Sequence, residues 1–491
     1  MNMLLNSMKQ ASNFTHTENG AITHKTTESK LLDMFAMGGS MRHRSVGDVT
    51  LMFKNAYEEN PVYALKCLFY LRDITQGQGE RRFFRECIKW LAINHTEAAR
   101  RNFEVIPVFG RWDDLYSFIG TPLEKEVFEF IKEQFELDLN CKTPSLLGKW
   151  LPSENASSKE TKEKAKITIK YFGLTPRYYR NALSTLRSRI NIVEKLMSQN
   201  RWEEIEFDKL PSRAGLIYRN AFARRDVIRE KYQAFAQSKE TKVNAAALTP
   251  VDIADKIFNN SHYWGSTKTS LSETERLMLQ KYWDNLKDYY NGREENGIAV
   301  VDVSGSMSGQ PMNAAVSMGA YIAERGKGPF ANHFITFSNN PELVEFTGVD
   351  ITDKFLRART ADWGNSTNIE AVFNLLLNTA IKQHLPQSEI PERIYIFSDM
   401  EFNRCTGCYK QSDMNTLLES IASNWKACGY EMPHLIFWNL DARQENIPAI
   451  GGRFSYVSGF SMTMVETILS GKDGFDLMMM KLDSERYSVI E

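Results

Sequence analysis

The chemistry in this chain is clearest at Asp302, Ser304 and Ser306, which form a D-x-S-x-S pattern directly after the apolar run 298–301. The pattern places one carboxylate and two hydroxyls at the end of a predicted buried strand. In an open α/β sheet, ligands bind at the carboxyl ends of the strands. One carboxylate with two hydroxyl oxygens suits Mg²⁺, which prefers oxygen ligands and usually keeps some of its waters. The incomplete shell leaves a position for a carboxylate or phosphate from a partner.

The elements that must position these side chains alternate between strands and helices. Such alternation indicates right-handed crossovers and a mostly parallel sheet. Asp302, Thr367 and Asp399 each fall just after or between these elements, so we expect them to meet at one edge of the sheet. The predicted elements are strand 298–301, helix 311–325, strands 333–337 and 342–346, helix 369–381, strand 393–397, helix 415–427 and strand 434–438.

Residues 296–491 resemble a von Willebrand factor A domain with a metal-ion-dependent adhesion site. The resemblance implies that Asp302, Ser304, Ser306, Thr367 and Asp399 bind the metal, some of them through water. This chain has Asn365-Ser366-Thr367 where the family often has Gly-Gly-Thr, so Ser366 is an alternative ligand. Mn²⁺ and Ca²⁺ accept similar ligands and stay open as alternatives to Mg²⁺. The competing interpretation is a Ser- and Gly-rich turn that caps a helix.

The length of 491 residues indicates two or more domains. We expect a flexible, polar segment over 1–29, a helical domain over 30–290 and the A-like domain over 291–491. No apolar run reaches the roughly 18 residues of a membrane span, and the first residues lack the pattern of a secretory signal. Six scattered cysteines suit reduced thiols and a cytoplasmic protein. Cys405 and Cys408 form a C-x-x-C pair, which we read as small loop residues, with a redox pair as the alternative.

The N-terminal half is predicted to be helical throughout. Apolar residues recur there at helical spacing, and Gly and Pro separate the segments. Short helix pairs joined by such turns indicate a HEAT-like solenoid or ring. The predicted helices are 49–57, 61–72, 81–93, 123–135, 179–196, 216–235 and 271–289.

The near-neutral total charge hides a strong asymmetry. Residues 1–290 hold 44 Lys and Arg against 36 Asp and Glu, whereas residues 291–491 hold 16 against 25. Within the first half, residues 159–231 hold 18 basic and 9 acidic residues. A basic half joined to an acidic half suggests a polyanion as the partner of the first half.

Basic residues with interleaved aromatics, as in 171–189, suit phosphates and unstacked bases, so we expect RNA binding. Near residue 81, backbone amides at a helix start can also hold a phosphate. The alternatives are solvated helix faces and, near residue 81, an ordinary turn between helices. The arginines that we expect to contact RNA are Arg81, Arg82, Arg177, Arg180, Arg187, Arg189, Arg213, Arg219, Arg224, Arg225 and Arg229.

A helical half followed by an A domain resembles the Ro autoantigen family, in which a TROVE module, a ring of HEAT-like helices, precedes this same domain. The stretches 65–73, 77–81, 110–114 and 437–440 are closer still to a group of uncharacterised relatives that carry a domain of unknown function. For the ring, the resemblance implies binding of structured or misfolded noncoding RNA. The arginines named above come from charge and spacing, not from the family.

Enzymatic readings fit poorly. There is no P-loop pattern, Ser304 does not lie in a G-x-S-x-G elbow, and His333 and His434 lie in apolar strands where core histidines are expected. We therefore expect an RNA-binding scaffold without catalytic activity, with a Mg²⁺-binding A domain that recruits a partner through an acidic side chain. The alternative is a metal-dependent protein-interaction adaptor that binds no RNA. A role as a particle component is neither supported nor excluded.

Overall fold

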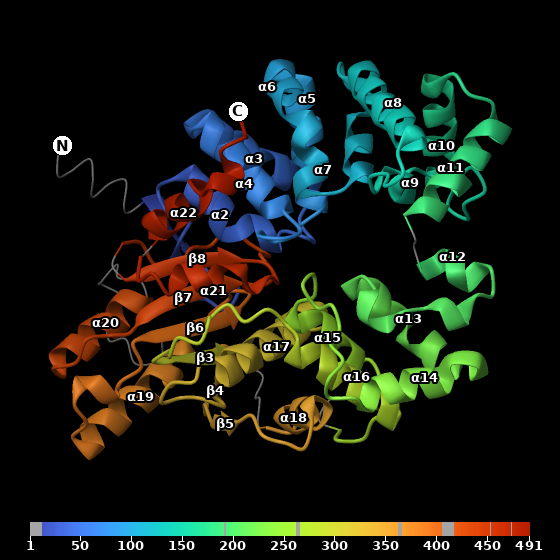
Figure 1. The fold of residues 1–491 in the computed structure, drawn as a ribbon. Coiled ribbons are helices and arrows are strands. Elements are labelled where there is room, and N and C mark those ends of the chain that lie inside the picture. The colour runs from blue at the N-terminus through green and yellow to red at the C-terminus, as the bar shows by residue number, and fades with distance from the viewer. Residues whose placement is uncertain are drawn as a thin grey trace.

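The computed structural model describes residues 12–190, 193–261, 266–361, 366–404, 417–451, 453–472 and 474–491. A helical half is followed by a half built on one six-stranded sheet (Figure 1). This arrangement confirms the predicted fold class. None of the described helices is long and apolar enough to cross a membrane.

Local signals start and stop the helices of the first half. Asn60 and Thr175 cap helices whose first residue is proline, and Gly173 ends another in the left-handed conformation that glycine favours. The helices are α2 (Lys30–Met37), α3 (Val46–Glu59), α4 (Pro61–Arg72), α5 (Arg82–Asn94), α6 (Thr96–Asn102), α7 (Ile106–Phe109), α8 (Glu124–Asn140), α9 (Leu147–Trp150), α10 (Lys159–Phe172), α11 (Pro176–Arg189), α12 (Val193–Ser198), α13 (Ser212–Arg224), α14 (Asp226–Gln237), α15 (Pro250–Phe258) and α16 (Glu273–Asp284).

The second half holds a sheet of order β5-β4-β3-β6-β7-β8, in which only the edge strand β5 runs antiparallel to its neighbour. β3 and β6 are adjacent at the centre, and the chain leaves β3 towards one edge and returns at β6 towards the other. This is the topological switch point where open α/β sheets bind ligands. The elements are β3 (Gly297–Val301), α17 (Gln310–Arg325), β4 (His333–Thr336), β5 (Leu343–Glu345), α18 (Ile351–Ala358), α19 (Ile369–Gln383), β6 (Arg393–Ser398), α20 (Leu417–Ala427), β7 (His434–Asn439), β8 (Phe454–Ser458), α21 (Val465–Ile468) and α22 (Gly474–Leu482).

The two halves close on each other. In Figure 1 the helices form an arc from α2 through α8–α11 to α13–α16, and the sheet lies between the two ends of the arc. At one end α2 packs on β7 and β8, and at the other α15 packs on α17. The C-terminal residues complete the closure, because Arg486 forms an ion pair with the buried Asp73 after α4 and Tyr487 stacks on Phe109 with ring centroids 5.7 Å apart.

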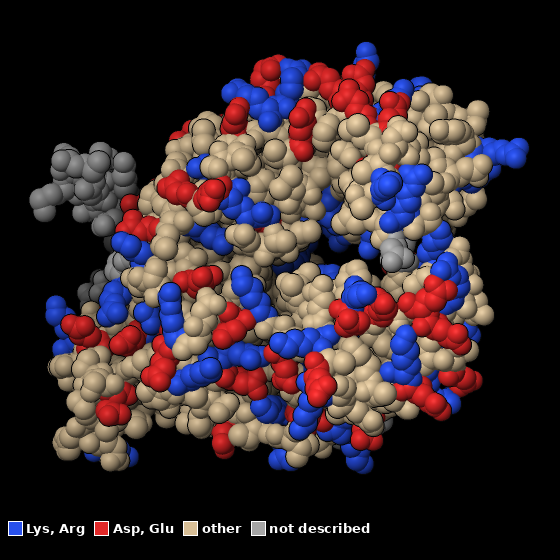
Figure 2. All heavy atoms as spheres, in the orientation of Figure 1, with Lys and Arg blue, Asp and Glu red and all other residues tan. Residues whose placement is uncertain are grey.

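The molecule is hollowed between the α8–α11 group and the α13–α15 group, and Lys and Arg side chains border the hollow in this view (Figure 2). The helices form only an arc, and they do not close into a ring by themselves. The sheet half supplies the segment that joins α16 back to α2.

Residues 12–29 differ from the flexible segment that we expected. They include a two-stranded antiparallel hairpin, β1 (Phe14–His16) and β2 (Ile22–His24), which hydrogen-bonds to the sheet half. His24 pairs with Ile447 through two backbone bonds, and the Thr17 hydroxyl donates to the carbonyl of Phe402 at 2.6 Å. These long-range hydrogen bonds order a segment that its polar composition alone predicts to be flexible.

Candidate metal centre and basic helical surface

Asp302 lies directly after β3 and is fully buried. One carboxylate oxygen accepts the backbone N–H of Ser304 at 2.9 Å, and the other accepts the hydroxyl of Ser398 at 2.6 Å. Burial and repulsion from Asp399 raise the pKa of Asp302 to about 7. The site thus holds a carboxylate that gains from any nearby positive charge.

Asp399 lies directly after the neighbouring strand β6 and supplies a second buried carboxylate. Its Oδ1 accepts the backbone N–H of Glu401 at 3.1 Å, whereas its buried Oδ2 has no hydrogen-bond partner among the described residues. The nearest cation described is Arg443, with Nη1 4.0 Å from that oxygen. Burial raises the pKa of Asp399, and the Ser306 hydroxyl works against this rise.

Ser304 and Ser306 bring their hydroxyl oxygens within 2.9 Å of each other in the loop after Asp302. Two buried carboxylates, two hydroxyls and an unpartnered Asp399 oxygen form a donor set that fits a hard divalent cation. A bound cation would neutralise the repelling pair and offer open positions to an oxygen ligand. The described residues contain no cluster of three or more His, Cys, Asp or Glu arranged for a metal, so the hydroxyls are needed to complete the shell.

The hydroxyl of Thr367, which we expected to bind the metal, is engaged in hydrogen bonds with other residues. Its hydroxyl lies 2.8 Å from the carbonyl of Glu401 and 3.0 Å from the side-chain oxygen of Asn403, and it accepts the amide of Asn19 at 3.1 Å. The alternative ligand Ser366 donates to Asn339 and accepts from Asn403, both at 2.7 Å. In the part of the chain that the structure describes, no hydrogen bond links either hydroxyl to Asp302, Ser304 or Ser306.

Sequence reasoning missed the N-terminal hairpin that lies over these loops. The backbone N–H of Glu18 donates to the buried carboxylate of Glu401 at 2.6 Å, and burial raises the pKa of Glu401 to about 7. The Glu18 carboxylate pairs with Arg443 at 3.0 Å, the same arginine that lies near Asp399. The signal was Asn19-Gly20, a dipeptide typical of tight hairpin turns, with Gly20 at φ 85°.

The predicted RNA-binding arginines divide into several groups. Arg81, Arg177, Arg224 and Arg225 are exposed and make no ion pair or side-chain hydrogen bond with described residues, although Arg225 stacks on Trp202 with its guanidinium 4.9 Å from the ring centre. Three more pair with acids: Arg180 with Glu154 at 2.5 Å, Arg213 with Asp252 at 3.5 Å and Arg229 with Asp226 at 2.8 Å.

The remaining four arginines hold the protein's own backbone. Arg82 donates to the carbonyls of Met41 and Arg42, Arg187 to those of Gly148 and Leu151, and Arg189 to those of Leu139 and Cys141 at the end of α8. Arg219 requires a correction. It is only 6% exposed and donates to the carbonyl of Leu216, so it belongs to the helical core and not to an exposed face.

The aromatics of this region are mostly internal as well. Phe172 and Tyr179 are buried, and Tyr171 is half-buried with its hydroxyl on Glu124. Tyr178, which is 53% exposed beside Arg177, is the residue of this group that faces solvent. Cys405 and Cys408 lie outside the described residues.

Comparison with known proteins places the chain among uncharacterised relatives. A family model described as a domain of unknown function, DUF2828, matches residues 17–143 and 147–289, and a second, DUF7788, matches residues 296–487. An uncharacterized protein, L728, of Acanthamoeba polyphaga mimivirus is 30% identical and covers 96% of this chain and 87% of its own length.

The crystal structure of the Deinococcus radiodurans Ro protein (RSR) aligns with a TM-score of 0.44 and 14% identity, over 94% of this chain and all of that one. The helical half and the following sheet half have the order expected from the sequence. The match to the uncharacterised group is confirmed. Because the DUF2828 model covers more than half of the residues and the mimivirus protein aligns over nearly the whole length, the chain belongs to the DUF2828 family.

Proposed function

We propose that the protein is an RNA-binding scaffold that holds noncoding RNA on its helical half and catalyses no reaction of its own. The A-like half would bind Mg²⁺, or another divalent cation, with Asp302, Ser304, Ser306 and Asp399. The cation would leave open positions for an acidic side chain of a partner protein. The two halves would then perform separate tasks within one closed molecule.

The exposure of the basic residues in 159–231 supports the RNA assignment. Fourteen of the eighteen Lys and Arg side chains in this stretch are exposed. Six of these make no ion pair or side-chain hydrogen bond with any residue that the structure describes. Phosphates of a nucleic acid neutralise such cations and release counterions, which is the main source of affinity for RNA. The six are Lys159, Lys162, Lys170, Arg177, Arg224 and Arg225.

The test is charge reversal at three of these positions. The variant Arg177→Glu/Arg224→Glu/Arg225→Glu should bind a structured noncoding RNA about tenfold or more weakly in a gel-shift assay, since it removes three cations and adds three repelling charges. The matched control is Lys382→Glu/Lys426→Glu/Lys472→Glu, which changes the total charge equally at exposed positions in the sheet half. Equal losses in both variants, or none in the first, would remove this surface from the account.

A protein-interaction adaptor without RNA is the second candidate, and the unpartnered oxygen of Asp399 favours it. In that case the cation site carries the function and the helical half is a docking surface. Asp302→Ala would then release a protein partner from nuclease-treated preparations, while no RNA binds the wild-type protein.

A further inference from the structure

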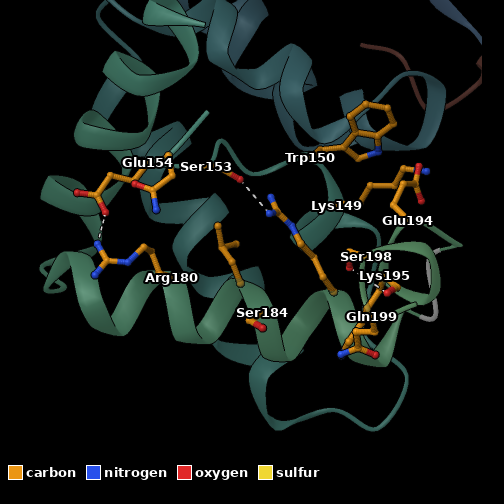
Figure 3. A pocket seen from close by; sticks show the side chains of 13 residues that line it. Lys149, Trp150, Ser153, Glu154, Arg180, Ser184, Glu194, Lys195, Ser198 and Gln199 are labelled. Carbon is orange, nitrogen blue, oxygen red and sulfur yellow. Dashed lines mark hydrogen bonds and ion pairs between the residues drawn. The ribbon is translucent and has the colours of Figure 1, made fainter. Parts of the chain in front are cut away.

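Trp150, the last residue of α9, lines a cavity of about 600 Å³ between α9, α11 and α12. A second cavity, of about 320 Å³, shares Trp150, Lys149, Ser153 and Arg187 with the first. Both volumes fall within or near the range of small-ligand pockets. In Figure 3, Trp150 lies across the larger cavity from Ser184, with the Arg180–Glu154 pair at one end and Lys195 and Ser198 at the other.

The indole of Trp150 is prepared for stacking. It is only half-buried, so part of the ring is accessible from the cavity that it lines. The guanidinium of Arg111 lies 3.9 Å from its centre, and that arginine is held by the carboxylate of Asp113 at 2.7 Å. The ammonium of Lys149 also lies over the ring, 5.6 Å from its centre, so a flat group such as a nucleobase that stacks on the indole would lie beside two cations.

Arg187 fixes the position of this ring. From α11 its guanidinium donates to the carbonyls of Gly148 and Leu151, on either side of Trp150, and to the hydroxyl of Ser153, each at 2.9 Å. Gly148 allows the close contact, because a Cβ there would lie 2.7 Å from the Cβ of Leu186. The Trp150 wall is therefore built onto a long helix before any ligand arrives, which lowers the entropic cost of binding.

The charges around the cavity suit a phosphate. Lys149 and Lys195 make no ion pair with described residues, whereas the two carboxylates of the lining are engaged: Glu154 pairs with Arg180 at 2.5 Å and Glu194 accepts the hydroxyl of Tyr218 at 3.2 Å. An aromatic wall, two available ammonium groups and several serine hydroxyls match the base, phosphate and ribose of one nucleotide.

We infer that this cavity binds one nucleotide of a single-stranded RNA segment, with its base against Trp150 and its phosphate at Lys149 and Lys195. The inference rests on the proposed RNA-binding function and assigns that function a specific site. A strand fits better than a free nucleotide, because α11 continues from the cavity wall to the exposed Arg177 and Tyr178, where further nucleotides would lie.

The probe is a short, fluorescently labelled oligouridylate that carries one photoreactive thiouridine. Irradiation should attach it to a peptide that contains Trp150 in the full-length protein. Trp150→Leu should weaken binding of the oligomer about tenfold or more, the loss expected for one stacked base, while Trp150→Phe keeps most of it. Trp90→Leu, at a half-buried tryptophan on α5, is the control, and thermal melting of each variant checks its folding.

Three other outcomes separate the inference from the function on which it rests. If structured RNA binds the wild-type protein but Trp150→Leu changes neither oligomer binding nor crosslinking, the site is wrong and the scaffold stands. If no RNA of any form binds, the proposed function is overturned together with the site. If uridine monophosphate binds in a Trp150-dependent way while no strand does, the cavity takes free nucleotides, and the assignment to RNA is overturned.

Discussion

The side-chain amide of Asn19 donates to the hydroxyl of Thr367 at 3.1 Å, across 348 residues of sequence. The same amide donates to the carbonyl of Glu401 at 2.6 Å. The turn of the N-terminal hairpin is therefore bonded to two of the loops that surround the candidate cation site.

Asn19→Ala should lower the free energy of unfolding by about 1–2 kcal/mol, because it removes two hydrogen bonds, while the Thr367 hydroxyl and the Glu401 carbonyl still bond to each other. Urea denaturation measures this change. A double-mutant cycle with Thr367→Ala isolates the direct contact and should give a coupling energy of at least about 0.5 kcal/mol. Asn140→Ala, which removes a local bond to the carbonyl of Glu136 on an exposed helix end, is the control and should cost less.

Asp399→Asn should change stability in opposite directions with and without a divalent cation. Without the cation, the variant should be as stable as the wild type or more stable, because it removes a buried carboxylate oxygen that has no hydrogen-bond partner among the described residues, together with its repulsion of Asp302. With Mg²⁺ at about a hundred times its dissociation constant, the wild type should gain about 2.7 kcal/mol and the variant little.

Thermal melting with and without Mg²⁺ measures both effects, and Asp483→Asn at an exposed position is the control. If none of Mg²⁺, Mn²⁺ and Ca²⁺ changes the melting temperature of the wild-type protein, the donor set binds no cation. Removal of Mg²⁺ with a chelator should return the wild type to its original melting temperature.

His434 should make the fold sensitive to acid. It is buried in β7 with its ring against the hydroxyl of Ser455 at 2.9 Å, and burial lowers its pKa from 6.5 to about 4. The unfolded chain therefore binds more protons than the folded chain between these pH values. The stability due to the neutral ring is present above pH 6.5 and is lost as the pH falls towards 4.

His434→Gln removes this group, so the difference in unfolding free energy between wild type and variant should shrink by up to about 3 kcal/mol as the pH falls through that window. Urea denaturation at a series of pH values gives the difference directly. A difference that stays constant with pH would show that the histidine titrates normally in the fold. Asp302 and Glu401, whose pKa values are raised, change the stability with pH in the opposite direction to His434. Their contribution is the same in both proteins and cancels when the unfolding free energy of the variant is subtracted from that of the wild type.

The meeting of Asp302 and Asp399 was predictable from the sequence, because each follows a short apolar strand and parallel strands share one carboxyl edge. The hydrogen-bond register confirms it, since the N–H of Asp302 donates to the carbonyl of Phe397 at 3.0 Å. The surroundings of Thr367 were not predictable in the same way. They depend on Asn19 and Glu401, and nothing local in either segment indicates that they meet.

The helical half shows the same limit. Its helices were predicted well, but the segment 216–235 is broken at Arg225, whose extended backbone (φ −83°, ψ 112°) separates α13 from α14 without a Gly or Pro. Arg219 was predicted to be exposed. Helical spacing shows which residues share a face of the helix, but it does not show whether that face points to solvent, and here tertiary contacts turn it inward. Strand β8 was not predicted. Phe454–Ser458 is short and mixes apolar with polar residues, and it forms a strand because it pairs with β7.

The salt dependence of RNA affinity tests the central claim most directly. A scaffold that holds phosphates on exposed cations must lose affinity as salt rises. The logarithm of the binding constant should fall linearly with the logarithm of the salt concentration, by about 0.7–0.9 for each phosphate contact. We predict a clearly negative slope for the wild-type protein and a slope shallower by about 2–3 for the Arg177, Arg224 and Arg225 triple reversal. Binding that does not change with salt, or equal slopes for the two proteins, would contradict the account.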